Sequence, residues 1–395
     1  MIALSETQEE LKKIAYLSIV LFGFISLFGD IIYEGARSIV PTYLKFLGAT
    51  AIIVGLVGGL GEFIGYSLRL VSGYLADSTK AYWFFFAIGY LLLISIPLLA
   101  LTNYWQIAII LVLLERTAKA LRSPARDTLL SVTTKGIATG KAFGWHEFMD
   151  QLGAVTGPMI IATALYLTVN DYHFAFSTLF VPYIILAILV FAVMAKLKPY
   201  TEKVFSELKK EERSTDQKLS TAFFVYTLAV FLNTAGLIHV SLILYVATGV
   251  AISWLVALIY LLIQAVDAVS APISGHLYDK MGRKVLIVPF LLSIVPSILT
   301  LIGTLETILL AAVFFGIVLG MQESIYRAAV SDLTPLGRRS TAYGIFNTGY
   351  GLGFLVSGFI FGIFIDYYMV NIAIMYSIIM QIAAIIILTA SLKTK

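Results

Sequence analysis

The chain has 395 residues, of which 59% are hydrophobic and only 13% are charged, and its formal net charge is +4. An average soluble domain is roughly 45–50% apolar and about 25% charged, so lipid must be a solvent for this chain. The sequence contains no cysteine, which excludes disulfides, iron–sulfur clusters and thiolate zinc sites. The positive charges lie beside the apolar runs, which argues against nucleic acid as a partner.

Apolar runs of about 20 residues recur along the chain, and each is long enough to cross roughly 30 Å of hydrocarbon. Turn signals and charge clusters mark their boundaries. The predicted spans cover residues 15–43, 50–76, 81–101, 105–126, 139–168, 174–195, 220–247, 252–277, 285–304, 308–332, 340–366 and 370–391. We therefore expect an all-α polytopic membrane protein with twelve transmembrane helices.

The positions of lysine and arginine predict how these spans are oriented. Lys45 alone falls in a loop on one side of the spans. The other side holds Lys12, Lys13, Lys80, Lys135, Lys141, Lys280, Arg283, Lys284, Arg338, Arg339, Lys393 and Lys395. By the positive-inside rule both termini lie in the cytoplasm, and we expect a multi-pass protein of the plasma (cytoplasmic) membrane.

One long polar segment interrupts the apolar pattern between spans six and seven. It contains Lys198, Lys203, Lys209, Lys210, Arg213 and several glutamates. We expect residues 196–219 to form a cytoplasmic linker, with one six-helix bundle in residues 1–195 and a second in residues 220–395.

The two predicted bundles repeat one pattern. Ala142, Gly144 and Gly153 recur as Ala342, Gly344 and Gly353, at an offset of 342 − 142 = 200 residues. Ser72, Gly73 and Asp77 recur as Ser274, Gly275 and Asp279, at an offset of 279 − 77 = 202 residues. Duplicated hydrophobic halves with ionisable residues at membrane depth are typical of secondary transporters, whose substrate site lies between the repeats near the bilayer midplane.

Charged residues inside the spans are the candidate site residues. Asp30, Glu34 and Arg37 are spaced i, i+4 and i+7, so they share one face of span one. An ionised group at the bilayer centre costs about 2.5–3.5 kcal/mol, so this face must line a wet cavity or pair internally. Further candidates are Glu62 in span two, Arg116 in span four, His146, Glu147 and Asp150 in span five, Asn233 in span seven, Asp267 in span eight, and Glu323 and Arg327 in span ten.

Some of these residues could have roles other than substrate binding or proton coupling. Glu323 and Arg327 are four residues apart and could form an ion pair that only stabilises their helix. His146 and Asp150 lie one turn apart and could bind a metal or relay a proton. A span with one histidine offers too few ligands for a closed metal site, so we expect no metal and no cofactor. No nucleophile–base pair or phosphate loop is evident, so we expect no enzyme activity.

The loop between spans eight and nine resembles a signature of the major facilitator superfamily, G-x-x-x-D-R/K-x-G-R-R/K. Its matching residues are Gly275, Asp279, Lys280, Gly282, Arg283 and Lys284. The equivalent loop of the first half keeps Gly73 and Asp77 but lacks the glycine–arginine pair. The resemblance implies the major facilitator fold, two pseudo-symmetric six-helix bundles, and a gate at the cytoplasmic side formed by these loop residues.

Two further stretches resemble the drug:proton antiporter branch of this superfamily. Gly144, Gly153, Gly157 and Pro158 fit the start of the exporter motif, G-x8-G-x3-G-P. Residues 116–120 resemble R-x-x-q-G, with lysine for glutamine and alanine for glycine. The resemblance implies that Arg116 influences a nearby acid and couples proton movement. Small residues at this spacing could also serve only close helix packing.

These observations lead to the hypothesis of a secondary active transporter that works by alternating access. We expect proton-coupled export of a small amphipathic or drug-like molecule, with the small-molecule substrate bound between residues 1–195 and 220–395 of a monomer in the lipid bilayer. Asp30, Glu34 or Glu62 would carry the proton, and Arg37 or Arg116 would pair with whichever acid is empty.

Other functions remain open at this point. Arg37, Arg69, Arg116 and Lys119 together could hold a carboxylate or phosphate, which favours a proton symporter or uniporter for an organic anion. The abundant aromatic residues suggest a lysolipid translocase, and a membrane enzyme or sensor is a further alternative. The direction of transport under a reversed pH gradient separates an antiporter from a symporter.

Overall fold

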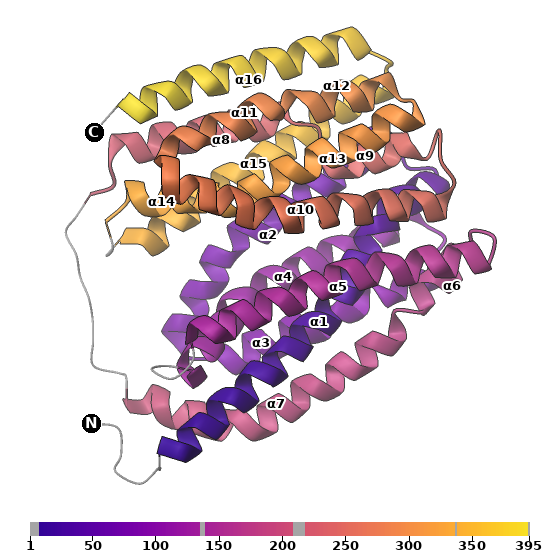
Figure 1. Cartoon of the computed structure of the whole chain (residues 1–395). Coiled ribbons are helices and arrows are strands. Elements are labelled where there is room, and N and C mark those ends of the chain that lie inside the picture. The colour runs from indigo at the N-terminus through magenta and orange to yellow at the C-terminus, as the bar shows by residue number, and fades with distance from the viewer. Residues whose placement is uncertain (1–7, 135–138, 208–217, 336–337, 394–395) are drawn as a thin grey trace.

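A computed structural model describes residues 8–134, 139–207, 218–335 and 338–393, and these residues form helices joined by short turns (Figure 1). The first half of the chain contains α1 (Gln8–Phe46), α2 (Ala51–Thr79), α3 (Tyr82–Leu91), η1 (Leu92–Ser95), η2 (Pro97–Leu101), α4 (Trp105–Thr134), α5 (Thr139–Leu167), α6 (Tyr172–Ser177) and α7 (Phe180–Glu207). The second half contains α8 (Thr221–Gly236), α9 (Val240–Ala247), α10 (Ser253–Met281), η3 (Gly282–Leu286), α11 (Ile287–Leu292), α12 (Ile294–Ile302), α13 (Leu305–Met321), η4 (Gln322–Tyr326), α14 (Arg327–Leu333), α15 (Arg339–Asp366) and α16 (Val370–Lys393).

The described residues contain ten stretches that are long and apolar enough to cross a membrane. One of them, Ser253–Ile302, includes both α10 and the returning pair α11 and α12. Helix α4 is long enough at 30 residues, but it carries Glu115, Arg116, Lys119, Arg122, Arg126 and Asp127 and is not among the ten. The all-α polytopic fold expected from the sequence is confirmed.

Each half of the chain has its own apolar core. One buried cluster is built almost wholly from residues between Ile19 and Leu197, and the other from residues between Phe223 and Leu388. Helix α7 continues to Glu207, so the first part of the predicted linker is helical. Residues 208–217, with Lys209, Lys210 and Arg213, and also Lys135 and Lys395 lie outside the described residues. The division at residues 195 and 220 stays a prediction.

Several of the expected spans are not continuous α-helices, and two of the interruptions, in spans seven and ten, lie beside interior polar groups. Residues 237–239 separate α8 from α9, and the freed backbone is satisfied locally because the Ile238 N–H donates to Ser297 Oγ at 2.9 Å. His239 Nδ1 accepts the Ser241 N–H at 3.1 Å and so caps α9. Within span ten, η4 is a π-helical turn. Both irregularities occur where interior polar groups gather, as membrane proteins allow only away from lipid.

The two halves meet closely along α2 and α15. At Gly358 an added Cβ would overlap the backbone carbonyl of Gly55, so only glycine allows this approach. Within the first half, α1 and α5 approach in the same way, since a Cβ on Gly35 would lie 3.2 Å from the Gly157 carbonyl oxygen.

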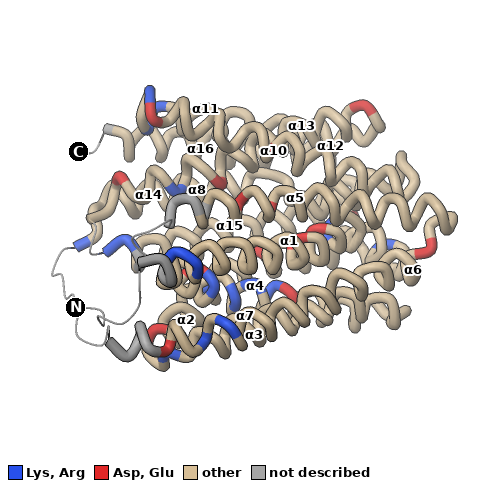
Figure 2. Tube along the Cα trace, turned by 60° about the horizontal axis from the view of Figure 1, so that its bottom comes forward, with Lys and Arg blue, Asp and Glu red and all other residues tan. Residues whose placement is uncertain are grey.

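The two ends of the molecule differ in charge and in contacts. Both termini lie at one end, where many lysines and arginines gather (Figure 2). At the opposite end, three polar contacts join the halves. Lys45 Nζ donates to the Tyr245 carbonyl at 3.2 Å, Tyr172 Oη lies 2.6 Å from Ser253 Oγ, and Asp366 accepts the N–H groups of Ala51 and Ile52 at 2.8 and 2.9 Å. We call these contacts the far-end latch.

Candidate functional site

Residues of both halves surround a central cavity with an empty volume of about 1290 Å³. Its walls come from α1, α2, α4 and α5 on one side and from α10, α13, η4, α14 and α15 on the other. The charged residues that line it are Asp30, Glu34, Arg37, Glu62, Arg69, Arg116, Lys119, Arg126, Glu147, Asp150, Asp267, Glu323 and Arg327. Charged groups of both signs therefore border one interior space, as the membrane cost of isolated charges demands.

Four of these residues form a continuous chain of ion pairs. Arg37 contacts Glu34 at 3.5 Å and also pairs with Glu62. Arg116 reaches Glu62 at 3.5 Å and, behind it, Glu115 at 3.4 Å. We call Glu34, Arg37, Glu62 and Arg116 the carboxylate–arginine chain. It places one carboxylate, that of Glu62, between two guanidinium groups from different helices.

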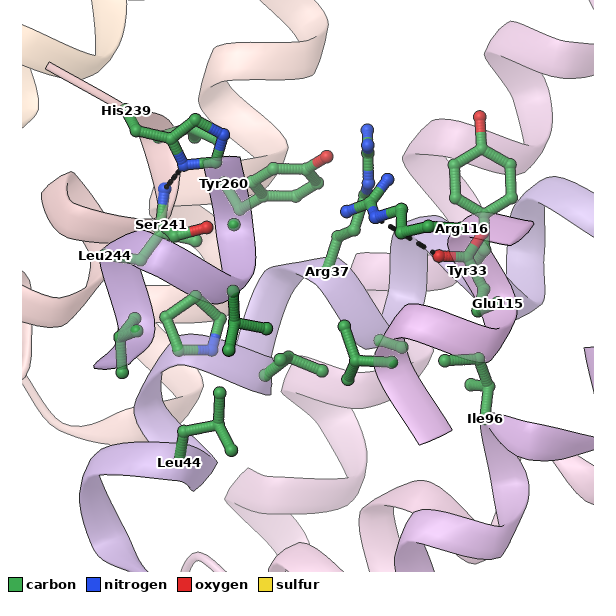
Figure 3. A pocket seen from close by; sticks show the side chains of 18 residues that line it. Tyr33, Arg37, Leu44, Ile96, Glu115, Arg116, His239, Ser241, Leu244 and Tyr260 are labelled. Carbon is green, nitrogen blue, oxygen red and sulfur yellow. Dashed lines mark hydrogen bonds and ion pairs between the residues drawn. The ribbon is translucent and has the colours of Figure 1, made fainter. Parts of the chain in front are cut away.

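The carboxylate–arginine chain also reaches the second half of the protein. The Tyr260 hydroxyl on α10 donates a hydrogen bond to the buried Glu34 carboxylate. Beyond this contact lies a smaller pocket with an empty volume of about 560 Å³, where Arg37, Arg116 and Tyr260 meet apolar residues such as Leu44 (Figure 3). The chain of ion pairs thus separates a charged cavity from a largely apolar pocket.

Asp30 lies beside a tyrosine and a lysine rather than in an ion pair. Lys119 Nζ donates to Tyr33 Oη at 2.9 Å and lies 4.2 Å from the centre of its ring. The same hydroxyl group lies 3.5 Å from Asp30 Oδ2. Tyr33 therefore connects a base on α4 to the acid on α1.

His146 and Asp150 contact each other and Ser26 of α1. His146 Nδ1 lies 3.1 Å from Asp150 Oδ2, and Ser26 Oγ lies 2.8 Å from His146 Nε2 and also donates to Asp150. Among the described residues, no group of three or more histidine and acidic side chains is placed to hold a metal ion.

Several charged residues of the cavity have no ion-pair partner within 4.0 Å among the described residues. These are Asp30, Arg69, Lys119, Glu147, Asp267, Glu323 and Arg327. Glu323 and Arg327 therefore do not form the ion pair that their spacing allows. Asp267 is only 3% exposed, and its Oδ1 atom has no hydrogen-bond partner.

Asn233 lies away from the cavity, in a buried polar network of the second half. Its side chain donates to Gln381 at 2.7 Å and to Ser293 at 3.1 Å, and it accepts from Tyr326 at 2.8 Å and from Gln322 at 3.3 Å. The network satisfies the whole amide group, as a buried polar side chain requires.

Comparison with known proteins decides the family. The family model of the Major Facilitator Superfamily matches residues 19–248 and 219–394. The chain belongs to the major facilitator superfamily. An uncharacterized protein of Mycobacterium tuberculosis is 35% identical over 357 residues, which cover 88% of this chain and 86% of that protein. An uncharacterized MFS-type transporter of Methanocaldococcus jannaschii is 29% identical over 364 residues, which cover 91% and 90%.

Solved structures agree with this assignment at the level of the fold. The nucleoside transporter NupG superposes with a TM-score of 0.74 at 14% identity, covering 96% of this chain and 100% of that chain. A peptide transporter POT in complex with sulfate gives a TM-score of 0.71 at 15% identity, covering 95% and 93%. Together with the family match, this makes the protein a multi-pass membrane transporter of the superfamily, and the expectation that it has no enzyme activity stays a prediction.

The superfamily signature lies at the end that carries the termini. Gly282 ends α10 with a positive φ of 63°, and Arg283 and Lys284 follow it in η3. Asp279 is exposed. In the first half, Asp77 accepts the Tyr82 hydroxyl at 2.8 Å, and Gly73 packs near Pro124. Among the described residues, no ion pair joins residues 73–80 to residues 275–284.

The glycines of the exporter-like motif pack unequally. Gly153 and Gly157 lie against the α1 backbone at Leu27 and Ile31, and Pro158 follows them inside α5. Gly144 faces open space, with no heavy atom within 4 Å of an added Cβ. The motif therefore supports the contact between α1 and α5 in its second part.

Four cavity tyrosines were not predicted as site residues. They are Tyr33, Tyr66, Tyr260 and Tyr350. For Tyr33 a signal was present, because it lies three residues after Asp30 and next to Glu34 and so shares the charged face of span one. Tyr66 and Tyr260 had the same signal, since Tyr66 lies four residues after Glu62 and Tyr260 lies seven residues before Asp267. Tyr350 lies among apolar and small residues, and nothing in its spacing separates it from a packing tyrosine.

Proposed function

We propose that this transporter exports a small amphipathic molecule in exchange for protons, by alternating access of the central cavity. Export is supported by the resemblance of spans four and five to the drug:proton antiporter branch. A charged cavity next to an apolar pocket suits a molecule with a polar and an apolar part. One chain contains the whole cavity, which supports a monomer. The lysines and arginines near both termini support a plasma-membrane protein with both termini in the cytoplasm.

The observation that carries the proposal is the contact between Glu34 and Tyr260. It joins the carboxylate–arginine chain of the first half to α10 of the second half. Protonation of Glu34 or Glu62 removes the negative charge that attracts Arg37 and Arg116. At Glu34 it also weakens the hydrogen bond accepted from Tyr260. Proton binding would therefore change a contact between the two halves, which is what coupling to a rocking motion needs.

The test uses purified protein in proteoliposomes loaded with a fluorescent pH indicator. The transported probe is the compound that most raises the melting temperature in a panel of drugs, sugars, amino acids, organic anions and lysolipids. Glu62→Gln and Asp30→Asn should abolish transport driven by a pH gradient while leaving the protein folded. Normal accumulation of the probe by both variants would remove these acids from the coupling step.

The direction of the imposed gradient tests antiport. Probe should accumulate against an opposing flow of protons, and reversing the gradient should reverse its movement. Uptake together with protons would favour the organic-anion symporter, for which the unpaired Arg69, Lys119 and Arg327 are the supporting observation.

A further inference from the structure

Two unpaired charges of the cavity, Arg69 and Asp267, lie near other groups of their own sign. Arg69 and Arg327 repel each other electrostatically, and neither has an ion-pair partner among the described residues. Asp267 interacts with three acids, Glu34, Glu147 and Glu323, and with no base of comparable influence. We call Arg69 and Arg327 the basic pole, and Asp267, Glu147 and Glu323 the acidic pole.

Each pole contains residues from both halves of the protein. In the basic pole Arg69 comes from α2 and Arg327 from α14, and in the acidic pole Glu147 comes from α5 and Asp267 from α10. Like charges from opposite halves oppose the approach of those halves. A bound group of opposite charge at each pole would turn both repulsions into attractions.

Both poles contain buried polar atoms that lack hydrogen-bond partners. Asp267 lines the cavity while nearly fully buried, and its Oδ1 atom lacks a hydrogen-bond partner. Arg69 Nε is likewise buried without a partner. A buried polar atom without a partner is destabilising, so these atoms favour a ligand that completes their hydrogen bonds.

We infer that the substrate is a compact zwitterion, with its anionic group at the basic pole and its cationic group at the acidic pole. Glu323 and Arg327 belong to different poles but are four residues apart on one helix, so the two poles adjoin. Guanidinium groups suit a carboxylate or phosphate, and carboxylates suit an ammonium group. This inference names the substrate class of the proposed transporter and rests on that proposed function.

Binding to purified protein without any gradient tests the inference separately from proton coupling. The probes are norfloxacin, a fluorescent zwitterion, its ethyl ester with only the cation, and its N-acetyl derivative with only the anion. Phenylalanine, phenylalaninamide and N-acetylphenylalanine form a second set. At least one parent zwitterion should bind at least about tenfold more tightly than both of its derivatives, as expected for one lost charged contact.

Two variants assign the poles. The Arg69→Gln variant should bind the parent zwitterion and its cationic derivative with equal affinity. The Asp267→Asn variant should bind the parent zwitterion and its anionic derivative with equal affinity. Asp267→Glu should restore discrimination, and Lys196→Gln, which changes an exposed charge on α7, serves as the control. A substitution that only disturbed the fold would weaken all three probes alike.

Three outcomes overturn the inference. They are equal or tighter binding of a singly charged derivative, unchanged discrimination in both variants, and no binding of either zwitterion. If gradient-driven transport of a singly charged compound persists in any of these cases, the proposed function stands and only the substrate class is wrong. Lysophosphatidylethanolamine compared with lysophosphatidic acid shows whether a lipid headgroup supplies the zwitterion.

Discussion

Glu62 holds the most constrained position among the cavity acids, because arginines from α1 and α4 both contact its carboxylate. Removal of the Glu62 carboxylate would leave Arg37 with Glu34 and Arg116 with Glu115 as their remaining ion-pair partners. Buried guanidinium groups do not stay unpaired at low cost, so neighbouring contacts must rearrange. Single residues of this kind can therefore link a local chemical change to the packing of whole helices.

A second residue, Asn233, acts on stability. Asn233→Ala would leave buried partners such as Gln381 and Tyr326 without their hydrogen bonds. Each unsatisfied group costs about 1–3 kcal/mol, so the melting temperature in detergent should fall clearly. Ser78→Ala, which changes an exposed hydroxyl, is the control and should leave the melting temperature unchanged. An equal melting temperature for both variants would show that the network contributes no stability.

At the scale of elements, the apolar runs were enough to predict the helices, since nothing but a helix can cross lipid in a chain of this composition. The break at residues 237–239 and the π turn η4 could not be predicted. Both depend on partners distant in sequence, such as Ser297 for the break. The charged face of span one was predictable from its spacing, but the poles depend on helices that only the fold brings together.

The close contact between α2 and α15 depends on glycine. Gly358→Val places a side chain on the backbone of Gly55 and should lower the melting temperature, because overpacking costs about 1–3 kcal/mol. Transport should fall too, since these helices join the two halves. Gly144→Ala adds a methyl group in open space and is the matched control. Full stability and transport in Gly358→Val would show that α2 and α15 can separate freely.

The far-end latch joins the two halves of the protein at the end opposite the termini. Asp366 contributes most directly, because it accepts two N–H groups at the start of α2. A carboxylate at a helix N-terminus is favoured by both its hydrogen bonds and the helix dipole. Alternating access requires this latch to break once in every cycle.

Asp366→Ala should therefore favour the state that is open at this end. A loss of about 1 kcal/mol corresponds to a roughly fivefold shift in populations. Because the chain has no cysteine, spin labels can be attached at Leu167→Cys and Val250→Cys without background, and their distance distribution measures the opening. Thr304→Ala, which removes the cap of α13 within the second half alone, is the control and should not widen this distance. Identical distributions in both variants would exclude Asp366 from the latch.

The two poles of the cavity have an electrical consequence. A molecule that brings one charge of each sign crosses the bilayer without moving net charge, so voltage acts only on the protons exchanged for it. One elementary charge gains or loses about 2.3 kcal/mol per 100 mV. A transporter with this cavity would thus draw on the membrane potential through its coupling ion alone, whatever the size of its cargo.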